Sequence, residues 1–242
     1  MRSGVGSLMV PPPALSTAAV VGGAAVWCGP GLAVHWAPVA RVLGVPLALR
    51  GRAGVALTFD DGPHPEGTPA VLNALRERHA RATFFLVGEQ VERYPTLAAE
   101  IVQEGHEVAV HGYRHRNQMR LTPQAFAADL DHAIEVISGV CGEALIHYRP
   151  PYGVFTLPGL AAVRRRGLTP LLWSRWGRDW RARWSAERIS ALATAGLTPG
   201  DVILLHDADW YSSSGSHRNT AAAVPAILDE LQRRGLTPMT AS

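Results

Sequence analysis

Cysteine is scarce in this 242-residue chain, which has only Cys28 and Cys141. Neither residue lies in a C-x-x-C pair, and no cysteine spacing typical of a zinc module is present. Cys28 falls in an apolar N-terminal stretch and Cys141 at the end of a predicted helix, so a bridge between them is not expected. Cysteine usage therefore excludes a cysteine-based zinc site and leaves the redox compartment open, secretion included.

A basic stripe is also missing, although the chain carries a formal net charge of +3. The densest basic groups, at 164–166 and 175–183, stand beside or among apolar residues. This pattern argues against a nucleic-acid-binding module. It favours a solvated surface, with weak attraction to anionic cell-surface polymers as the alternative. All 23 basic residues are arginine and none is lysine, which fits a GC-rich bacterial genome.

Charged side chains are absent from residues 14–34, a run of 21 residues that could span a bilayer. Its glycines and proline make a poor soluble helix but are better tolerated in membranes. We favour a membrane anchor. A cleaved signal peptide, whose charged start and cleavage site are weak here, and a buried or disordered leader remain the alternatives. We expect residues 1–52 to form this leader and a linker, and residues 53–242 to form one folded domain.

Strand-like and helix-like segments alternate from residue 55 onward, with no signal for an antiparallel hairpin. Thr68-Pro69 and Thr122-Pro123 each place a capping hydroxyl before a proline, as at helix starts. Strands are predicted at 55–59, 82–88, 107–112, 146–151, 168–176, 201–207 and 237–240. About seven such β-then-α units predict a parallel sheet covered by helices. Polar clusters follow five of the strands, which favours a (β/α) barrel, with its loops around one mouth, over an open sheet.

Two adjacent carboxylates, Asp60 and Asp61, directly follow the first predicted strand. They are costly to ionise together unless a cation or an arginine lies nearby. Neighbouring strand residues point in opposite directions, so the two carboxylates can take different roles only where the strand ends and twists. The alternative is a turn, since Asp-Asp-Gly-Pro suits a turn without any function.

His111 and His115 follow the third predicted strand. An i, i+4 pair on a helical turn presents two imidazoles to one point, as metal sites require. With one carboxylate they would make a set of three ligands suited to catalytic Zn²⁺ or another divalent first-row metal. The alternative is two surface histidines.

Three further polar groups follow later strands. Arg149 precedes a stiff proline turn and could hold a carboxylate ionised. His206 ends a strongly apolar strand, where an imidazole without a partner would be costly. A nearby carboxylate, for which Asp179 is a candidate, would raise the pKa of His206 and make it a general acid. The alternatives are an exposed arginine and a core histidine bonded to backbone.

These groups together resemble the five signature motifs of the polysaccharide deacetylase family, which is carbohydrate esterase family 4 or the NodB-homology domain. The motifs are TFDDG at 58–62, H-x-x-x-H at 111–115, RPPYG at 149–153, DW at 179–180 and LLHD at 204–207. The resemblance runs from about Val55 to the C-terminus, and five motifs in order are specific where one would be weak. It implies a distorted (β/α) barrel with a bound divalent cation.

The resemblance also implies roles for the residues around that cation. Asp61, His111 and His115 would be the metal ligands. Asp60 would be the catalytic base, and Arg149 would hold it. The metal would be zinc in the first place, with cobalt, manganese and nickel as alternatives.

Five other residues receive roles on the substrate side. The resemblance makes His206 the catalytic acid, tuned by Asp179. The backbone N–H of Tyr152 would help to stabilise the oxyanion. Trp180 and Leu205 would form the walls of a pocket for the acetyl methyl group.

The function that follows is metal-dependent hydrolysis of the N-acetyl group of N-acetylglucosamine units in a cell-wall or chitin-like glycan. We expect an N-acetylated glycan as the partner, no nucleic acid, a monomer, and a location in the cell envelope or outside the cell. The alternatives are a deacylase for a small molecule or lipid-linked sugar, and a non-catalytic carbohydrate-binding protein.

One position departs from the family pattern. The fourth motif of the family is often D-x-x-D-W, and here Trp176 occupies the place of the first aspartate. Asp179, next to Trp180, is kept. The departure therefore bears on the substrate side of this loop more than on the chemistry.

Overall fold

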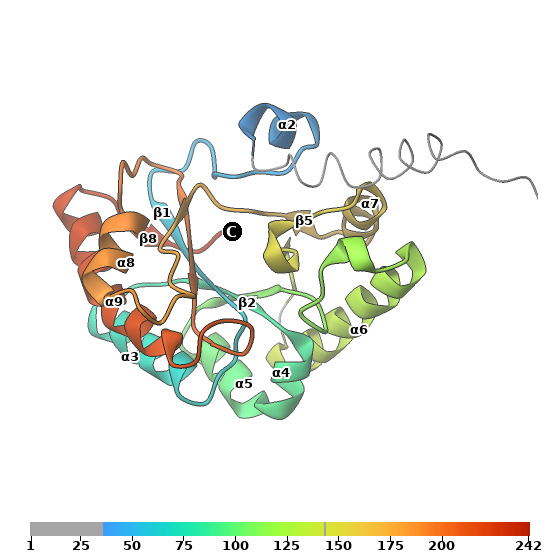
Figure 1. The fold of residues 1–242 in the computed structure, drawn as a ribbon, viewed down its shortest axis with the longest axis horizontal. Coiled ribbons are helices and arrows are strands. Elements are labelled where there is room, and N and C mark those ends of the chain that lie inside the picture. Colours follow the sequence, from blue (N-terminus) through green and yellow to red (C-terminus); the bar gives the residue numbers. More distant parts are fainter. Residues whose placement is uncertain (1–35, 143) are drawn as a thin grey trace, which may run out of the picture.

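A curled parallel sheet forms the centre of the computed structural model, which describes residues 36–142 and 144–242 (Figure 1). Within these ranges the strand order is β5-β4-β3-β2-β1-β7-β6, and β8 pairs with β1 beside this path. The strands are β1 Val55–Asp60, β2 Thr83–Leu86, β3 Glu107–Val110, β4 His147–Tyr148, β5 Thr169–Pro170, β6 Arg175–Trp176, β7 Val202–His206 and β8 Pro238–Met239. The predicted class, a distorted barrel of parallel strands, is confirmed as a curled half-barrel.

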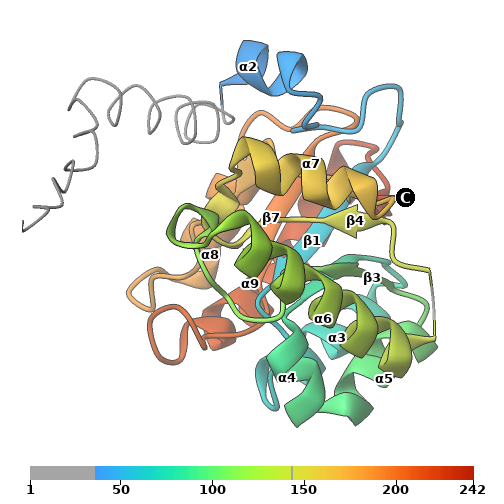
Figure 2. The same cartoon turned by 90° about the vertical axis from the view of Figure 1, so that its right-hand side faces the viewer.

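Helices lie around the outside of this sheet (Figures 1 and 2). They are α2 Ala37–Val42, α3 Gly67–Glu77, α4 Gly88–Arg93, α5 Pro95–Gln103, α6 Pro123–Cys141, α7 Leu157–Arg165, α8 Ala186–Ala193 and α9 Ser216–Arg233. The start of α6 is as predicted, because the Thr122 hydroxyl accepts a hydrogen bond from the Ala125 N–H. The cap predicted at Thr68 is wrong, since Thr68 lies inside α3 and its hydroxyl has another partner.

The strand predicted at 168–176 is two strands at opposite edges of the sheet. β5 pairs with β4, whereas β6 pairs with β7. Between them the chain crosses from one edge to the other: the Leu171 N–H donates to the carbonyl of Tyr148, and the Ser174 N–H donates to that of Val202. Because the sheet is curled, its two edges come close enough for one short segment to pair with both of them. A continuous apolar run in the sequence is therefore not always one strand.

The segment before β1 lies along the barrel. Val45 is buried there, and the Leu49 N–H donates to the carbonyl of Gly200. The uncharged run at 14–34 lies outside the described residues, so the anchor, its alternatives and the boundary at residue 52 stay predictions. No described helix combines the length and the apolar character needed to cross a bilayer.

Candidate active site

A cavity of about 340 Å³ lies at the carboxyl ends of the strands. Polar residues reach it because parallel strands bring their ends and following loops to one edge. In the neighbouring strands β1 and β7, Asp60 lies directly opposite His206. The lining residues are Asp60, Asp61, His111, His115, Tyr152, Gly153, Trp173, Trp176, Trp180, Leu204, His206, Tyr211 and Ser212.

Asp61, His111 and His115 form a group with the chemistry of a cation site. Oδ1 of Asp61 lies 3.4 Å from Nε2 of His111 and 3.3 Å from Nε2 of His115. Ligands about 2.0–2.2 Å from a tetrahedral metal lie about 3.3–3.6 Å from one another, so the spacing fits. Oδ1 of Asp61 is buried and has no hydrogen-bond partner, which a cation would supply.

The two histidines reach this point from a loop. His111 follows β3 directly, and 111–115 has no helical turn, so the predicted helical setting is wrong although the imidazoles converge. Nδ1 of His111 lies 2.8 Å from the carbonyl of Arg149. Since a carbonyl can only accept, Nδ1 carries the proton and the lone pair of Nε2 faces Asp61. This is the tautomer that a metal ligand needs.

His115 is held by ring contacts. Its ring stacks on Tyr211 with centroids 4.1 Å apart and an interplanar angle of 8°. Tyr152 contacts the same ring edge-on, with centroids 4.7 Å apart. Burial by itself raises the pKa of Asp61, but the two adjacent imidazoles outweigh burial and hold that pKa well below its usual range. The carboxylate is therefore charged and ready to face a cation.

The neighbouring carboxylate, Asp60, is held separately. Nη1 of Arg149 lies 2.6 Å from Oδ1 of Asp60, and both side chains are almost fully buried. The guanidinium also donates to the hydroxyl of Thr58 at 2.8 Å and to the carbonyls of Leu171 and Leu172 at 3.2 and 3.0 Å. Burial lowers the pKa of Arg149, and the Asp60 carboxylate opposes that effect. Oδ2 of Asp60 remains on the cavity side, 3.8 Å from Nε2 of His111.

His206 stands at the end of β7 with Asp179 behind it. Nδ1 of His206 lies 3.0 Å from Oδ1 of Asp179. Oδ2 of Asp179 accepts from the backbone N–H of His206 at 2.7 Å and from the Thr220 hydroxyl at 2.8 Å. Burial lowers the pKa of His206, but the charge and hydrogen bond of Asp179, with a contribution from Asp61, raise it to about 10. The imidazole is thus kept protonated, as a proton donor must be.

The predicted methyl pocket needs one correction. Leu204, not Leu205, lines the cavity together with Trp180. Alternate residues of a strand face the same side, so Leu204 shares the side of His206, and Leu205 is fully buried in the core. The sequence also gave no sign of Tyr211, which lies in the long loop after β7 without any motif around it.

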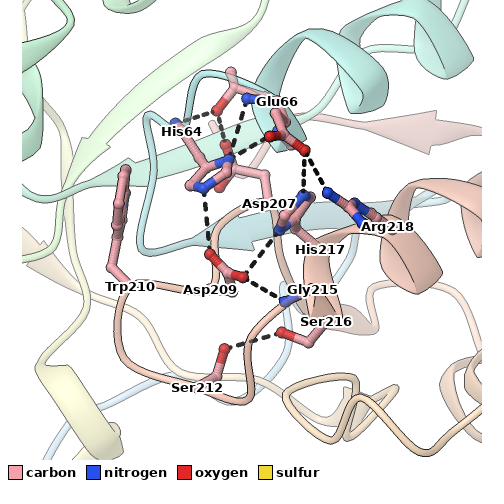
Figure 3. Close-up of polar contacts among 12 residues, drawn as sticks. His64, Glu66, Asp207, Asp209, Trp210, Ser212, Gly215, Ser216, His217 and Arg218 are labelled. Carbon is pink, nitrogen blue, oxygen red and sulfur yellow. Dashed lines mark hydrogen bonds and ion pairs between the residues drawn. The ribbon is translucent and has the colours of Figure 1, made fainter.

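A second group with metal-ligand chemistry is His64, Asp209 and His217 (Figure 3). It joins the loop after β1 to the loop after β7 and lines no part of the cavity. Asp209 lies between the imidazoles, with Oδ1 at 3.2 Å from Nε2 of His64 and Oδ2 at 3.3 Å from Nδ1 of His217. Burial lowers the pKa of His64, with the charge of His217 acting in the same direction.

The tautomer of His64 argues against a cation at this second group. Its Nδ1 accepts hydrogen bonds from the N–H groups of Glu66 and Gly67, at 3.2 and 3.0 Å. The neutral ring therefore carries its proton on Nε2, the nitrogen that faces Asp209. A metal ligand needs the reverse arrangement, which His111 has. His64 is instead the side chain that caps the start of α3.

Asp207 strengthens the same junction between loops. It is fully buried, and the hydroxyl of Thr68 donates to its Oδ2. A side chain at Gly62 would collide with this carboxylate, which explains a glycine directly after the aspartate pair. Burial raises the pKa of Asp207 to about 7, and the charge of Asp61 acts in the same direction.

Known proteins resemble this chain in sequence and in fold. A family model described as polysaccharide deacetylase matches residues 50–171. A chitooligosaccharide deacetylase of Bradyrhizobium sp. (strain ANU 289) is 38% identical over 192 residues, covering 76% of this chain and 87% of the relative. A peptidoglycan-N-acetylglucosamine deacetylase of Bacillus cereus is 32% identical over 204 residues, covering 83% and 72%. The crystal structure of the Bc1960 peptidoglycan N-acetylglucosamine deacetylase, solved with a naphthalenyl N-oxidanyl-benzamide, matches with a TM-score of 0.75 and 30% identity, covering 80% and 88%.

Proposed function

The chain belongs to the polysaccharide deacetylase family, and on this premise we propose that it hydrolyses the N-acetyl groups of N-acetylglucosamine units in a cell-wall or chitin-like glycan. The reaction gives acetate and a free amine, and the enzyme is a hydrolase of linear amide bonds. The observation that carries the proposal is that one cavity contains three separate groups with the chemistry of a cation site, a base and an acid. A carboxylate with two imidazoles stands beside a second carboxylate held by arginine and an imidazole held by aspartate.

The residues present fit a resident divalent cation. The orphaned Oδ1 of Asp61 and the metal-ready tautomer of His111 both support one, with His115 as the third ligand. When bound, a divalent cation lowers the pKa of water and polarises an amide carbonyl. Two nitrogens and one oxygen suit Zn²⁺ first, with cobalt, manganese and nickel as the alternatives.

The side chains themselves supply the proton transfers and the orientation. Oδ2 of Asp60, the oxygen that Arg149 leaves free, takes a proton from the water that attacks the acetyl carbon. The backbone N–H of Tyr152 donates to the oxygen that becomes negative. Nε2 of His206 then gives its proton to the sugar nitrogen as the C–N bond breaks. Trp180 and Leu204 surround the acetyl methyl group.

Acetate release from N-acetylated glycans tests the proposal. Wild-type protein should release acetate from N-acetylglucosamine oligomers or peptidoglycan, lose this activity in EDTA and regain it with added Zn²⁺. His111→Ala should be inactive, whereas His132→Ala, which changes an exposed histidine of α6, should not. Release from small acetylated or lipid-linked sugars alone would favour the small-molecule deacylase. Glycan binding without release by metal-replete protein would favour a non-catalytic binding protein and overturn the proposal.

We further propose that the protein acts as a monomer in the cell envelope or outside the cell, either membrane-anchored through residues 14–34 or secreted. The uncharged run in the sequence and a polymeric envelope substrate support this location. Fractionation of cells that express the full chain, followed by mass spectrometry of its N-terminus, separates an anchored form from a cleaved one. Light scattering of the purified protein tests the monomer.

A further inference from the structure

Three indoles form a row along one wall of the cavity. Trp173 and Trp176 have ring centroids 6.1 Å apart, and those of Trp176 and Trp180 are 5.4 Å apart. The row ends on the proposed acid, because the ring of Trp180 meets that of His206 edge-on at 5.8 Å. Trp176 therefore stands one aromatic ring away from the group that protonates the leaving amine.

Trp176 belongs to a small set of large hydrophobic side chains that are exposed in the described part of the chain. It is 37% exposed although it lines the cavity, whereas large apolar side chains that serve only the core of this protein are buried. An exposed indole at the mouth of a cavity gives a flat apolar face without stabilising the fold. Tyr152, next to His115, is the other exposed aromatic residue of the cavity, at 58%.

The orientation of the Trp176 ring is restricted by its neighbour Arg178. The guanidinium carbon of Arg178 lies 4.7 Å from the centre of the Trp176 ring. Arg178 is an arginine in the left-handed region, with φ of +52°, a conformation that costs free energy for a residue with a Cβ. The guanidinium therefore packs on the indole, a contact that restricts the ring in advance of binding.

We propose that Trp176 forms a subsite for the sugar ring next to the N-acetylglucosamine unit being deacetylated. This inference rests on the proposed function. The leaving amine stays on the sugar, so the glycan must run along the His206 side of the cavity, which is where the indole row lies. A pyranose presents C–H groups on its faces, and these pack on an exposed indole. In the family pattern an aspartate often takes this position, so the subsite would be a property of this chain.

The test compares glycan lengths. The quantity is the ratio of kcat/KM for the N-acetylglucosamine pentamer to that for the single sugar, N-acetylglucosamine, which has no neighbouring ring; both are measured by acetate release from metal-replete protein. In Trp176→Ala and Trp176→Asp this ratio should fall roughly three- to tenfold, as expected for loss of one aromatic contact. Trp176→Phe, which keeps an aromatic ring, should retain most of the wild-type ratio. Trp36→Ala, which removes an exposed indole at the start of α2, is the matched control and should leave the ratio unchanged.

The outcomes separate the subsite from the proposed function. An unchanged ratio in Trp176→Ala, or equal losses on the single sugar and the pentamer, overturns the subsite while the deacetylase activity stands. If wild-type protein releases no acetate from any oligomer, the proposed function fails. Calorimetric binding of the glucosamine pentamer, which has no acetyl group to lose, then decides the subsite directly. Weaker binding by Trp176→Ala but not by Trp36→Ala supports it, and equal binding overturns it.

Discussion

Replacement of Asp179 by asparagine should remove the proton-donating ability of His206 without changing the shape of the site. Both oxygens of Asp179 accept hydrogen bonds. Oδ1 accepts from the ring Nδ1 of His206, and Oδ2 accepts from the backbone N–H of His206 and from the Thr220 hydroxyl. Asparagine has one oxygen, and that oxygen should stay with the two donors. Its NH₂ group then faces Nδ1 of His206, so a protonated ring would place one donor against another.

The size of the effect follows from the loss of the charge. Against burial, which lowers the pKa, Asp179 is the largest cause that raises the pKa of His206 to about 10. An opposite charge at this distance is worth about 1–3 pKa units, or about 1.4–4 kcal/mol between protonation states. The donor conflict adds to this loss. A bound cation would offset the contribution of the cavity carboxylates but not that of Asp179.

The assay is the pH dependence of kcat/KM for acetate release, together with NMR titration of His206. The alkaline limb of the profile should move down by at least about one pH unit in Asp179→Asn, and activity at pH 9 should fall more than at pH 6. Thr220→Val, which removes one hydrogen bond and no charge, should leave the limb in place. An alkaline limb that does not move in Asp179→Asn would refute the reasoning.

Three further predictions concern the cation, the buried ion pair and the loop junction. Purified protein should contain one equivalent of divalent metal, measured by inductively coupled plasma mass spectrometry. Asp61→Ala should lose this metal, whereas His64→Ala should keep it, because the tautomer of His64 does not suit a metal ligand. Arg149→Met should lower the free energy of unfolding in urea by about 3–5 kcal/mol, since it leaves the charge of Asp60 buried alone, and a second change of Asp60→Leu should recover part of the loss. The pKa of Asp207 is raised from 3.8 to about 7, so the stability it contributes is full below pH 3.8 and is lost as pH rises through 7. Melting temperatures from pH 4 to pH 8 should accordingly fall more in wild type than in Asp207→Asn, and parallel curves would contradict this.

The sequence predicted the fold class and the gathering of the motifs because these depend on strand order and on strand ends. The sequence did not show which of the two leucines faces the cavity, since either Leu204 or Leu205 satisfies the apolar pattern. The side of the strand on which His206 lies decides between them. The sequence also could not divide the run at 168–176, because the break depends on the curl of the whole sheet.

Side-chain tautomers lay further beyond the sequence. His64 and His111 both follow strands and both lie near carboxylates, so the pattern alone cannot tell a cap from a ligand. The partner of Nδ1 decides, and that partner is a backbone N–H for His64 and a backbone carbonyl for His111. Tyr211 reaches the ring of His115 from a loop whose path no local signal fixes.

The hydrogen bonds of Arg149 also link the orientation of Asp60 to the closure of the sheet. One guanidinium joins the end of β1, through Thr58 and Asp60, to the carbonyls of Leu171 and Leu172 in the segment that crosses between the sheet edges. These partners are far apart in the chain, so they meet only when the half-barrel has been completed. The orientation of the Asp60 carboxylate therefore depends on the segment that closes the half-barrel as well as on β1.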